Sequence, residues 1–387
     1  MTRTRIAAVC GALLALTLSA CGSSSSDGPT GSTSDDVIKQ AKASTEQALA
    51  GTDRALPTDG PKAQAGKTVW ALACSTQAAG CVVPAQGFVD ASKALGWKVK
   101  LVDGKADPAV YNSQLRAAAA ANVDAVALFG VDCSVVKASI EVVGAAGVKV
   151  YGGNALDCDD KFSNGGKPLF DEHLRFNQDL ISYEDYMSTF VGPTIADWAI
   201  AKTDGKAEVI LMRQDDNATL RMVGDAQAGR LAECDGCVVH EVTFTSDDLF
   251  GGKLQGKAAA ALQQFPNADV VMVPADSAIT LGVGAAVDQA RQGGRKDLLL
   301  AGNEGVASSI TLIRNGTQSY AVGRPLTWTG WAAADGLNRL FAGEKPVDSG
   351  MGIGSMDAKH LPHGDVYDGN RASSGYQENY KKIWGVD

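Results

Sequence analysis

Histidine is scarce in this chain, with four residues among 387. General acid–base catalysis relies on histidine more often than on any other side chain, and no Ser–His–Asp order or paired-carboxylate pattern stands out. His360 and His363 have neither a cysteine nor an acidic ligand pair beside them, and the glycines at 282 and 284 lack the third glycine of a dinucleotide-binding turn. The sequence therefore predicts no catalytic residue, no metal site and no cofactor.

Basic residues are outnumbered, with 35 lysines and arginines against 44 aspartates and glutamates, which gives a formal net charge of −9. Binding to nucleic acid requires a basic surface, and the sequence has no basic stripe, so nucleic acid is excluded as a partner. After residues 6–20 the chain has no second apolar run that approaches the roughly 20 residues of a membrane-spanning helix. The remaining composition is that of an ordinary soluble globular protein.

The first 20 residues have the layout of an export signal. Arg3 and Arg5 precede the apolar run 6–20, which ends in the sequence LSACG at 18–22. This ending resembles the lipobox of bacterial lipoproteins, in which the cysteine becomes the lipidated first residue. We expect residues 1–20 to be a signal peptide and Cys21 to carry the lipid that holds the protein on the outer face of the cytoplasmic membrane. The alternative is an ordinary signal cleaved nearby, with Cys21 as a free thiol.

Residues 21–66 separate the signal from the folded body. The stretch 23–32, rich in serine and glycine, cannot bury enough apolar surface to fold and predicts a flexible tether. Residues 35–50 are interpreted as one exposed helix, and 57–66 as an extended linker. We expect the folded body to begin near Lys67.

About 320 residues remain, which is more than one hydrophobic core usually supports, so two lobes are expected. Short valine-rich runs alternate with helical patterns, as is typical of parallel sheets covered by helices on both faces. We assign 67–182 plus 324–346 to the first lobe, and 183–323 plus 347–387 to the second lobe and C-terminal tail. Strands are predicted at 69–73, 99–102, 125–129, 148–152, 209–212, 238–244, 270–273, 298–301 and 320–322, and second-lobe helices near 219–232, 252–265, 278–292, 305–315 and 330–342.

Four motifs follow one another in a specific order. Residues 107–132, from Asp-Pro through VDAVAL to Asp, are followed by GVKV at 147–150, by PNADVV and Ala-Asp within 266–282, and by AGNEG at 301–305. Together they resemble the type I periplasmic sugar-binding proteins of bacterial ABC importers, the ribose- and galactose-binding group. The resemblance covers roughly 67–345. It implies two Rossmann-like lobes with parallel sheets, joined by a hinge.

The resemblance also implies that a small polar ligand binds between the lobes, beyond the carboxyl ends of the strands. The loop after the first strand lacks the aromatic residues that the family places there, which leaves small polar donors. Each candidate has an alternative structural role, as a cap, a turn residue, a surface residue or a core residue. The candidate ligand-binding residues are Ser75, Gln77, Asp132, Asn154, Arg221, Asp276, Asn303, Glu304, Arg324 and Trp328.

Six cysteines remain when Cys10 and Cys21 are set aside, and six cysteines allow 15 pairings. Disulfides persist outside the cytoplasm. Their places in the expected fold favour three local bonds, although sequence order alone does not decide between pairings. The predicted bonds are Cys74–Cys81, Cys133–Cys158 and Cys234–Cys237.

The sequence as a whole predicts a monomeric, lipid-anchored binding protein that delivers a sugar or polyol to an ABC permease. A ligand-sensing receptor of the same fold is the alternative among binding proteins, and a thiol-redox or hydrolytic lipoprotein is the alternative from another class. The CxxC motif at 234–237 closes a helix, whereas redox-active motifs open one, so a structural bond is favoured. The acidic residues 157, 159 and 160 are interpreted as a solvated loop, with calcium binding as the alternative.

Overall fold

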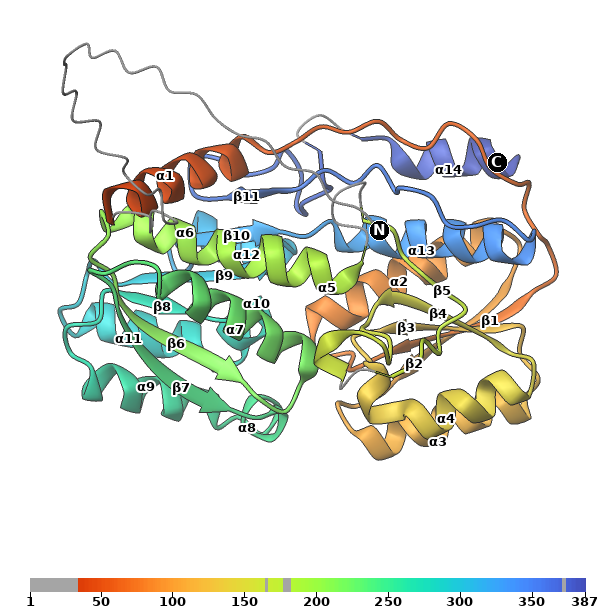
Figure 1. Cartoon of the computed structure of the whole chain (residues 1–387), viewed down its shortest axis with the longest axis horizontal. Coiled ribbons are helices and arrows are strands. Elements are labelled where there is room, and N and C mark those ends of the chain that lie inside the picture. The colour runs from red at the N-terminus through yellow and green to blue at the C-terminus, as the bar shows by residue number, and fades with distance from the viewer. Residues whose placement is uncertain (1–33, 164–165, 177–181, 371–373) are drawn as a thin grey trace, which may run out of the picture. The chain divides into compact units, whose positions relative to one another are not determined.

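The computed structural model describes residues 34–163, 166–176, 182–370 and 374–387. The predicted signal peptide, the lipidation site Cys21 and the predicted tether lie outside these residues. The body from Ser34 onward contains two sheets, each flanked by helices, and we call the two halves built on them the first and the second lobe (Figure 1).

The first lobe is built on a five-stranded sheet in the order β2-β1-β3-β4-β5, in which all paired strands are parallel. The helix α13 joins this lobe from the C-terminal part of the chain. The elements are β1 (Thr68–Ala73), α2 (Ala79–Ala94), β2 (Lys98–Asp103), α3 (Pro108–Ala120), β3 (Ala125–Phe129), α4 (Cys133–Ala145), β4 (Lys149–Asn154), η1 (Lys161–Ser163), β5 (Glu172–His173) and α13 (Leu326–Phe341).

Both faces of the first sheet are covered at its centre, which explains why the central strand β3 is apolar and buried throughout. Successive residues of a strand point to opposite faces. Ala71 of β1 belongs to the core shared with α2 and α13, whereas its neighbour Leu72 packs with Leu115 of α3 and Ile140 of α4. Figure 1 shows α3 and α4 on one side of this sheet and α2 and α13 on the other.

The second lobe is built on a six-stranded sheet in the order β11-β10-β9-β8-β6-β7. Its strand β11 pairs antiparallel with β10, and the other pairs are parallel. The elements are α5 (Tyr183–Asp185), the π-helical turn η2 (Tyr186–Val191), α6 (Gly192–Lys202), β6 (Glu208–Gln214), α7 (Ala218–Leu231), β7 (Val238–Phe244), α8 (Ser246–Phe250), α9 (Leu254–Gln264), β8 (Val270–Met272), α10 (Asp276–Ala278), η3 (Ile279–Val283), α11 (Gly284–Gln292), β9 (Leu299–Glu304), α12 (Ala307–Arg314), β10 (Tyr320–Gly323) and β11 (Gly354–Met356).

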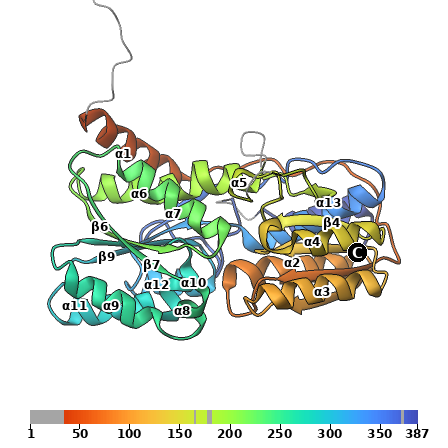
Figure 2. The same cartoon turned by 60° about the horizontal axis from the view of Figure 1, so that its bottom comes forward.

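The second sheet is also covered on both faces. Ile195 of α6 and Val223 of α7 belong to one buried cluster, and Leu262 of α9 and Val287 of α11 belong to another. Figure 2 shows α6 and α7 above the sheet and α9 and α11 below it. Within the described part of the chain, no helix combines the length and the apolar character that crossing a bilayer requires.

Glycine allows α13 to pack directly on α2. An added Cβ at Gly330 of α13 would lie 2.2 Å from the carbonyl oxygen of Pro84 and 2.3 Å from the amide nitrogen of Phe88, both in α2. Gly87 of α2 meets the backbone of Thr327 in the same way, with a separation of 2.4 Å. The two helix backbones are therefore in contact at positions where a methyl group would not fit.

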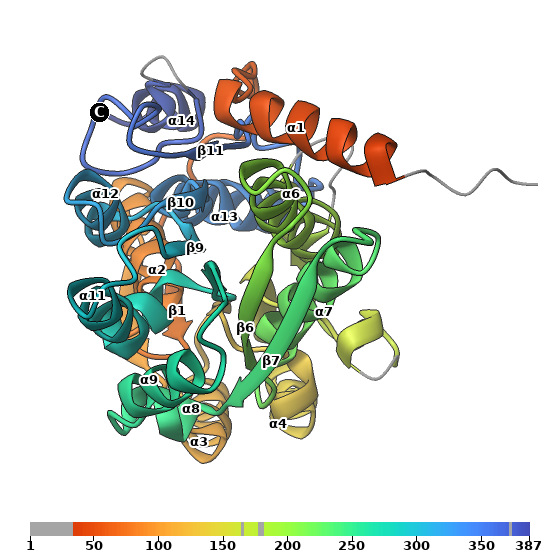
Figure 3. The same ribbon diagram turned by 90° about the vertical axis from the view of Figure 1, so that its left-hand side faces the viewer.

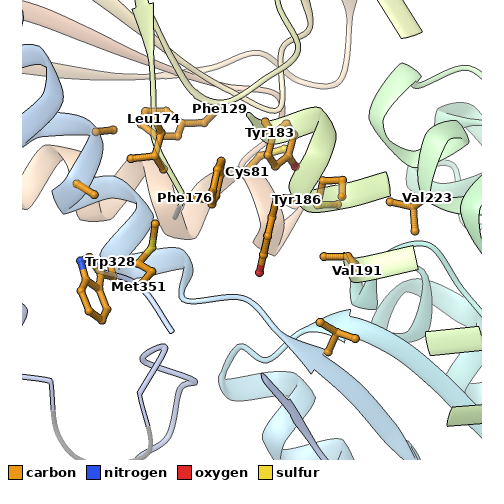
Figure 4. Packing of buried hydrophobic residues seen from close by; sticks show 14 of the residues in the cluster. Cys81, Phe129, Leu174, Phe176, Tyr183, Tyr186, Val191, Val223, Trp328 and Met351 are labelled. Atoms are coloured by element: carbon orange, nitrogen blue, oxygen red, sulfur yellow. The ribbon is translucent and has the colours of Figure 1, made fainter. Parts of the chain in front are cut away.

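A stack of aromatic rings marks the place where the chain passes from the first lobe to the second. The rings of Phe176 and Tyr186 are stacked with their centroids 4.7 Å apart, and Tyr183 lies 5.7 Å from Phe176. Figure 4 shows these rings together at the N-terminal end of the helical segment 183–202 (α5, η2 and α6), which we call the crossing helix. This packing orients Tyr183, whose hydroxyl contributes to the site described below.

The helix predicted at 35–50 is present as α1 (Ser34–Ala50), but the expectation that it is exposed is wrong. Val37, Ala41, Thr45 and Ala48 are buried, and their spacing of three to four residues places them on one face of the helix. This face packs on α6 and β11 (Figure 3). The folded body consequently begins at α1 and not near Lys67.

Residues 51–66 connect α1 to the first lobe and contact elements of both lobes. The amide of Thr52 donates to the carbonyl oxygen of Ile353, 2.9 Å away, and Arg54 pairs with Asp348. Further along, the amide of Gln64 donates to Oδ1 of Asn338 in α13, also at 2.9 Å. The segment 57–66, interpreted as an extended linker, is also bonded near its start, where Nδ2 of Asn379 donates to the carbonyl oxygen of Pro57 at 2.8 Å, so both of its ends are bonded to the body.

The C-terminal tail divides between the lobes, whereas the sequence placed all of 347–387 with the second lobe. Its strand β11 joins the second sheet. Its helix α14 (Tyr376–Trp384) packs on α13 of the first lobe, where the rings of Trp384 and Trp331 stack 5.8 Å apart. Apolar residues of α14 repeat at helical spacing and are buried on this side.

Candidate functional site

A pocket lies between the lobes at the carboxyl ends of their parallel strands. Its walls are formed by the start of α2, the ends of β4, β6 and β9, the loop after β10, and the first turns of α7 and α8. The empty space between these walls is about 590 Å³, including the opening to solvent. Open α/β sheets bind their ligands at this end of the strands, which is where the sequence placed the site.

Glu304, the last residue of β9, extends from the second lobe to the first helix of the first lobe. It is 2% exposed, and an added Cβ at Gly80 of α2 would lie only 2.3 Å from its Oε1. The nearby backbone N–H groups of Ser277, Gly80 and Asp276 favour the ionised form of its carboxyl group. A carboxylate is stabilised at such helix N-termini. The residue also has a φ of +111°, which is uncommon for a residue other than glycine.

Arg324, which follows β10, supplies the positive charge at this end of the pocket. It is 5% exposed, its Nη2 donates to the hydroxyl of Tyr183 at 3.1 Å, and its Nη1 donates to Oδ1 of Asn303 at 3.5 Å. Its backbone N–H donates to the carbonyl oxygen of Glu304, 3.0 Å away. The neighbouring strands β9 and β10, together with Tyr183 of the crossing helix, therefore hold the buried acidic side chain of Glu304 beside the buried basic side chain of Arg324.

Burial has a strong effect on the two carboxyl groups near Arg324. It raises the pKa of Glu304 to about 7, although the charge of Arg324 favours the ionised form. Burial, together with the charge of Glu304, also holds the pKa of Asp276 well above its usual range. Glu304 and Asp276 are thus protonated more readily than exposed carboxyl groups are.

Four residues that line the pocket each carry a buried polar atom without a hydrogen-bond partner among the described residues. Three are acceptors, namely Asn154 Oδ1, Gln214 Oε1 and Glu304 Oε2, and one is a donor, Arg324 Nε. Buried polar atoms are nearly always paired, because leaving one unpaired costs about 1–3 kcal/mol. The pocket therefore matches a ligand that offers several donors and at least one acceptor, as hydroxyl groups do.

Asp132 lies beside the pocket and joins the two lobes. Its Oδ1 accepts a hydrogen bond from the amide of Leu156, 3.0 Å away in the first lobe. Both of its oxygens lie 3.2 Å from the hydroxyl of Thr219 in the second lobe. Asp132 lines a neighbouring cavity rather than the pocket itself. Its position supports lobe contact, whereas the sequence assigned it to the ligand.

Of the ten predicted ligand-binding residues, Asn154, Glu304 and Arg324 line the pocket. Asn303 accepts a hydrogen bond from Arg324, and Asp276 accepts one from Gln318 at 2.9 Å, but neither Asn303 nor Asp276 lines the pocket. Ser75 is buried and accepts a hydrogen bond from the amide of Gln77, and both lie off the wall. Arg221 is half-buried in α7 and also lies off the wall.

Trp328 corrects the sequence-based prediction most clearly. It is fully buried, its ring stacks on Tyr376 at 4.8 Å, and its Nε1 donates to the hydroxyl of Tyr380 at 3.3 Å. Both tyrosines belong to α14. Because α14 covers this face of α13, Trp328 contributes to the core and not to the pocket.

Several residues of the pocket wall were not predicted from the sequence. Gln214 ends β6, and Thr219 lies in the first turn of the next helix, so the rule that strand ends carry the site would have selected both. Tyr183 has no such signal. It reaches the pocket from the crossing helix, whose position depends on contacts between distant parts of the chain.

The three predicted cysteine pairs are each brought together. The Cα atoms are 5.6 Å apart in Cys74–Cys81, 5.0 Å in Cys133–Cys158 and 5.4 Å in Cys234–Cys237, with the sulfurs placed as disulfides. The first pair lines the pocket. Gly130 adjoins it closely, since a Cβ there would lie 2.4 Å from the sulfur of Cys81. The CxxC pair lies in the turn between α7 and β7, as its position in the sequence indicated.

The acidic loop at 157–160 is organised by its own backbone. Oδ1 of Asp157 accepts hydrogen bonds from the amides of Cys158 at 2.6 Å and Leu169 at 2.9 Å, and its Oδ2 accepts one from Phe170 at 3.1 Å. Oδ2 of Asp160 accepts from the amide of Asp157. These contacts give the two carboxylates a structural role in the insertion.

Comparison with known proteins identifies one family and many related folds. The sequence profile described as "periplasmic binding protein domain" matches residues 75–345. No curated protein matches the sequence.

Among solved structures, an ABC transporter solute binding protein from Bacillus halodurans C-125 with bound myo-inositol has a TM-score of 0.63 and 16% identity, covering 77% of this chain and 97% of that one. The corresponding protein from Mycobacterium smegmatis with bound glycerol has a TM-score of 0.63 and 15% identity, with coverages of 78% and 99%. The protein from Agrobacterium vitis with bound allitol has values of 0.60 and 14%, with coverages of 76% and 97%. At these identities the likeness shows a shared fold.

Proposed function

The chain belongs to the periplasmic binding protein domain family, and we propose that it captures a sugar or polyol between its lobes for uptake by an ABC transporter. Proteins of this kind bind solutes outside the cytoplasm and are not enzymes. The similar structures named above hold glycerol, myo-inositol and allitol, which are all neutral polyols. Their ligands support the same ligand class here.

The observation that carries the proposal is the set of unpartnered atoms on the pocket wall. Asn154, Gln214 and Glu304 each present a buried acceptor, and Arg324 presents a buried donor. Hydroxyl groups both donate and accept, so a polyol has the chemistry to pair with acceptors and with a donor in one site. A carboxylate ligand would satisfy Arg324 but would place a further ionised group in a buried site, which is unfavourable.

We further propose that the protein works as a monomer tethered to the membrane by a lipid on Cys21, on the outer face of the cytoplasmic membrane. The lipobox-like sequence at 18–22 and the serine-rich stretch that follows support this arrangement. A lipid anchor would keep the ligand-loaded protein close to its permease. Mass spectrometry of the protein purified from membranes tests the anchor, because a diacylated or triacylated peptide that begins at Cys21 is expected.

A thermal-shift screen tests the proposed ligand class. A ligand that binds the native state stabilises it by RT ln(1 + [L]/Kd), about 2.7 kcal/mol at a concentration of 100 Kd. We expect pentoses, hexoses or polyols to raise the melting temperature by several degrees, and amino acids and small aromatic acids to leave it unchanged. A shift with an amino acid and none with any carbohydrate would overturn the proposal.

A further inference from the structure

The pocket has a polar end and an apolar end, and the order of the strands in the two sheets accounts for this division. In the second sheet, β10 and β9 lie side by side and carry Arg324 and Glu304, whereas β6 and β7 lie at the opposite edge. In the first sheet, β4 carries Asn154, and β2 lies at the far edge, followed by Ala106. Arg324 and Glu304 thus come from one side of the second sheet, and Asn154 comes from one side of the first.

Contacts across the cleft show which edges face each other. Within the first lobe, Asn154 donates from Nδ2 to the carbonyl oxygen of Gly80 at 3.0 Å, and Glu304 of the second lobe packs against Gly80 across the cleft. At the other end, Ala106 and Tyr111 share a cavity with Asn217 and Ser246. The β4 side of the first lobe therefore faces β9 and β10, and the β2 side faces β6 and β7.

The end of the pocket at β2 and β7 is mostly apolar. Ala106 and Tyr111 line it from the first lobe, and Leu220, Leu249 and Phe250 line it from the second. Leu220 and Phe250 are half-buried, so their apolar surface is available to a ligand, and Leu249 is 4% exposed.

The polar atoms at this apolar end are largely used by the protein itself. Oδ1 of Asn217 accepts from the amide of Leu220 at 2.9 Å, where it caps α7. The hydroxyl of Ser246 accepts from Nε2 of Gln214 at 3.0 Å. Three of the four unpartnered atoms belong to Asn154, Glu304 and Arg324 at the opposite end of the pocket. The fourth is Oε1 of Gln214, the last residue of β6.

We infer that the ligand is a neutral polyhydroxylated molecule with an apolar substituent at one end, such as a sugar whose terminal hydroxyl is replaced by hydrogen, an alkyl group or a thioether. The inference rests on the proposed function and refines its ligand class. Hydroxyl groups pair with the unpartnered atoms at the end formed by Glu304 and Arg324. Gln214, at the end of β6, offers one further acceptor to a hydroxyl group, and beyond it the wall consists of Leu220, Leu249 and Phe250, against which a methyl group removes more apolar surface from water than a hydroxyl group does.

Matched sugar pairs that differ only in the terminal hydroxyl test this inference. Isothermal titration of the purified protein compares L-fucose with L-galactose, L-rhamnose with L-mannose, and 5-deoxy-D-ribose with D-ribose. We expect the deoxy sugar to bind at least roughly tenfold tighter in the pair that fits the stereochemistry of the site. Equal or tighter binding of the hydroxylated member in every pair that binds would overturn the inference and leave the proposed function standing. Binding by no member of any pair, with no shift in the polyol screen, would overturn both.

A variant at the apolar end provides an independent test. Leu220→Asn places an amide where the deoxy carbon is expected, so the ratio of affinities within the pair should fall from about tenfold toward one. Leu312→Asn, in the half-buried face of α12 away from the pocket, is the matched control and should keep the ratio. Because the readout is a ratio within one protein, a general loss of stability in the variant does not mimic the expected result. An unchanged ratio in Leu220→Asn would overturn the inference.

Discussion

The carboxylate of Asp132, at the end of the first lobe's strand β3, is bonded to Thr219, in the first turn of α7 in the second lobe. The hydroxyl of Thr219 lies 3.2 Å from both carboxylate oxygens, and its amide lies 3.3 Å from Oδ2. Asp132 is 4% exposed and Thr219 is 5% exposed, so this cross-lobe contact is sheltered from water. Hydrogen bonds to charged groups contribute about 1.5–3 kcal/mol, and this one favours the lobes in contact.

Replacing Thr219 with valine should therefore shift the protein toward an open form. The substitution keeps the shape of the side chain and removes the hydroxyl. We expect small-angle scattering of the ligand-free protein to show a larger radius of gyration, and the affinity for any sugar found by thermal shift to weaken by roughly tenfold. Thr311→Val is the control, because within the described part of the chain the hydroxyl of Thr311 bonds only to the carbonyl oxygen of Ala307 in its own helix. Identical scattering and affinity in Thr219→Val would show that the bond does not hold the lobes together.

The contact between α2 and α13 predicts a large effect of one methyl group. Gly330→Ala would place its Cβ about 2 Å from backbone atoms of α2, which must move apart. We expect a loss of about 2–4 kcal/mol in the free energy of unfolding, measured with urea. Gly229→Ala is the matched control in α7, where an added Cβ meets no atom of the described residues within 4 Å. That substitution should stabilise the protein by up to about 1 kcal/mol. Equal effects of the two substitutions would contradict the packing described here.

The raised pKa of Glu304 predicts a dependence of stability on pH. Its pKa is about 7 in the folded protein against an ordinary value of 4.5, so in this window the folded state holds a proton that the unfolded chain has released. Stability from this group is therefore present at low pH and is lost as the pH rises through about 7. Glu304→Gln should flatten the fall in melting temperature between about pH 5 and 8, although Asp276, whose pKa is also raised, retains part of it. Glu378→Gln, on the exposed surface of α14, should leave the profile as in the natural protein. An unaltered slope in Glu304→Gln would contradict the assignment.

The disulfide pairing predicts a definite peptide map. Proteolysis of the unreduced protein should release Cys74 linked to Cys81, Cys133 linked to Cys158, and Cys234 linked to Cys237. Closing a loop of about eight residues at Cys74–Cys81 stabilises the folded state by roughly 2–3 kcal/mol in the chain-entropy model. The double variant Cys74→Ser, Cys81→Ser should melt lower accordingly. A bond between Cys74 and a cysteine of the second lobe would contradict the two-lobe arrangement.

The fold was largely predictable because buried parallel strands have a strong local signal. The nine predicted strands correspond to β1–β4 and β6–β10, because most of them contain a short run of valine and other apolar residues, which is buried throughout in central strands such as β3 and β8. The strands β5 and β11 were missed because they contain two and three residues and no such run. The burial of α1 was also not predicted, because its few apolar residues form no strong local pattern and are buried only through their contact with α6.

The site was only partly predictable, and the reasons lie in contacts between distant residues. Asn154, Glu304 and Arg324 follow the carboxyl ends of strands, and that position is visible in the sequence. Trp328 was assigned wrongly because its direction depends on α14, about 50 residues later in the chain. Tyr183 was missed because the aromatic stack with Phe176 that orients it has no local pattern.

The most direct test of the pocket as a binding site for hydroxyl-rich solutes is calorimetric titration with the sugar that gives the largest thermal shift. We predict one binding site per chain in the natural protein, and affinities weakened at least roughly tenfold in both Asn154→Ala and Gln214→Ala, because each loses a buried acceptor. Gln86→Ala, on the exposed face of α2, should bind as the natural protein does. Full affinity in both pocket variants would contradict the account and would place the ligand elsewhere on the molecule.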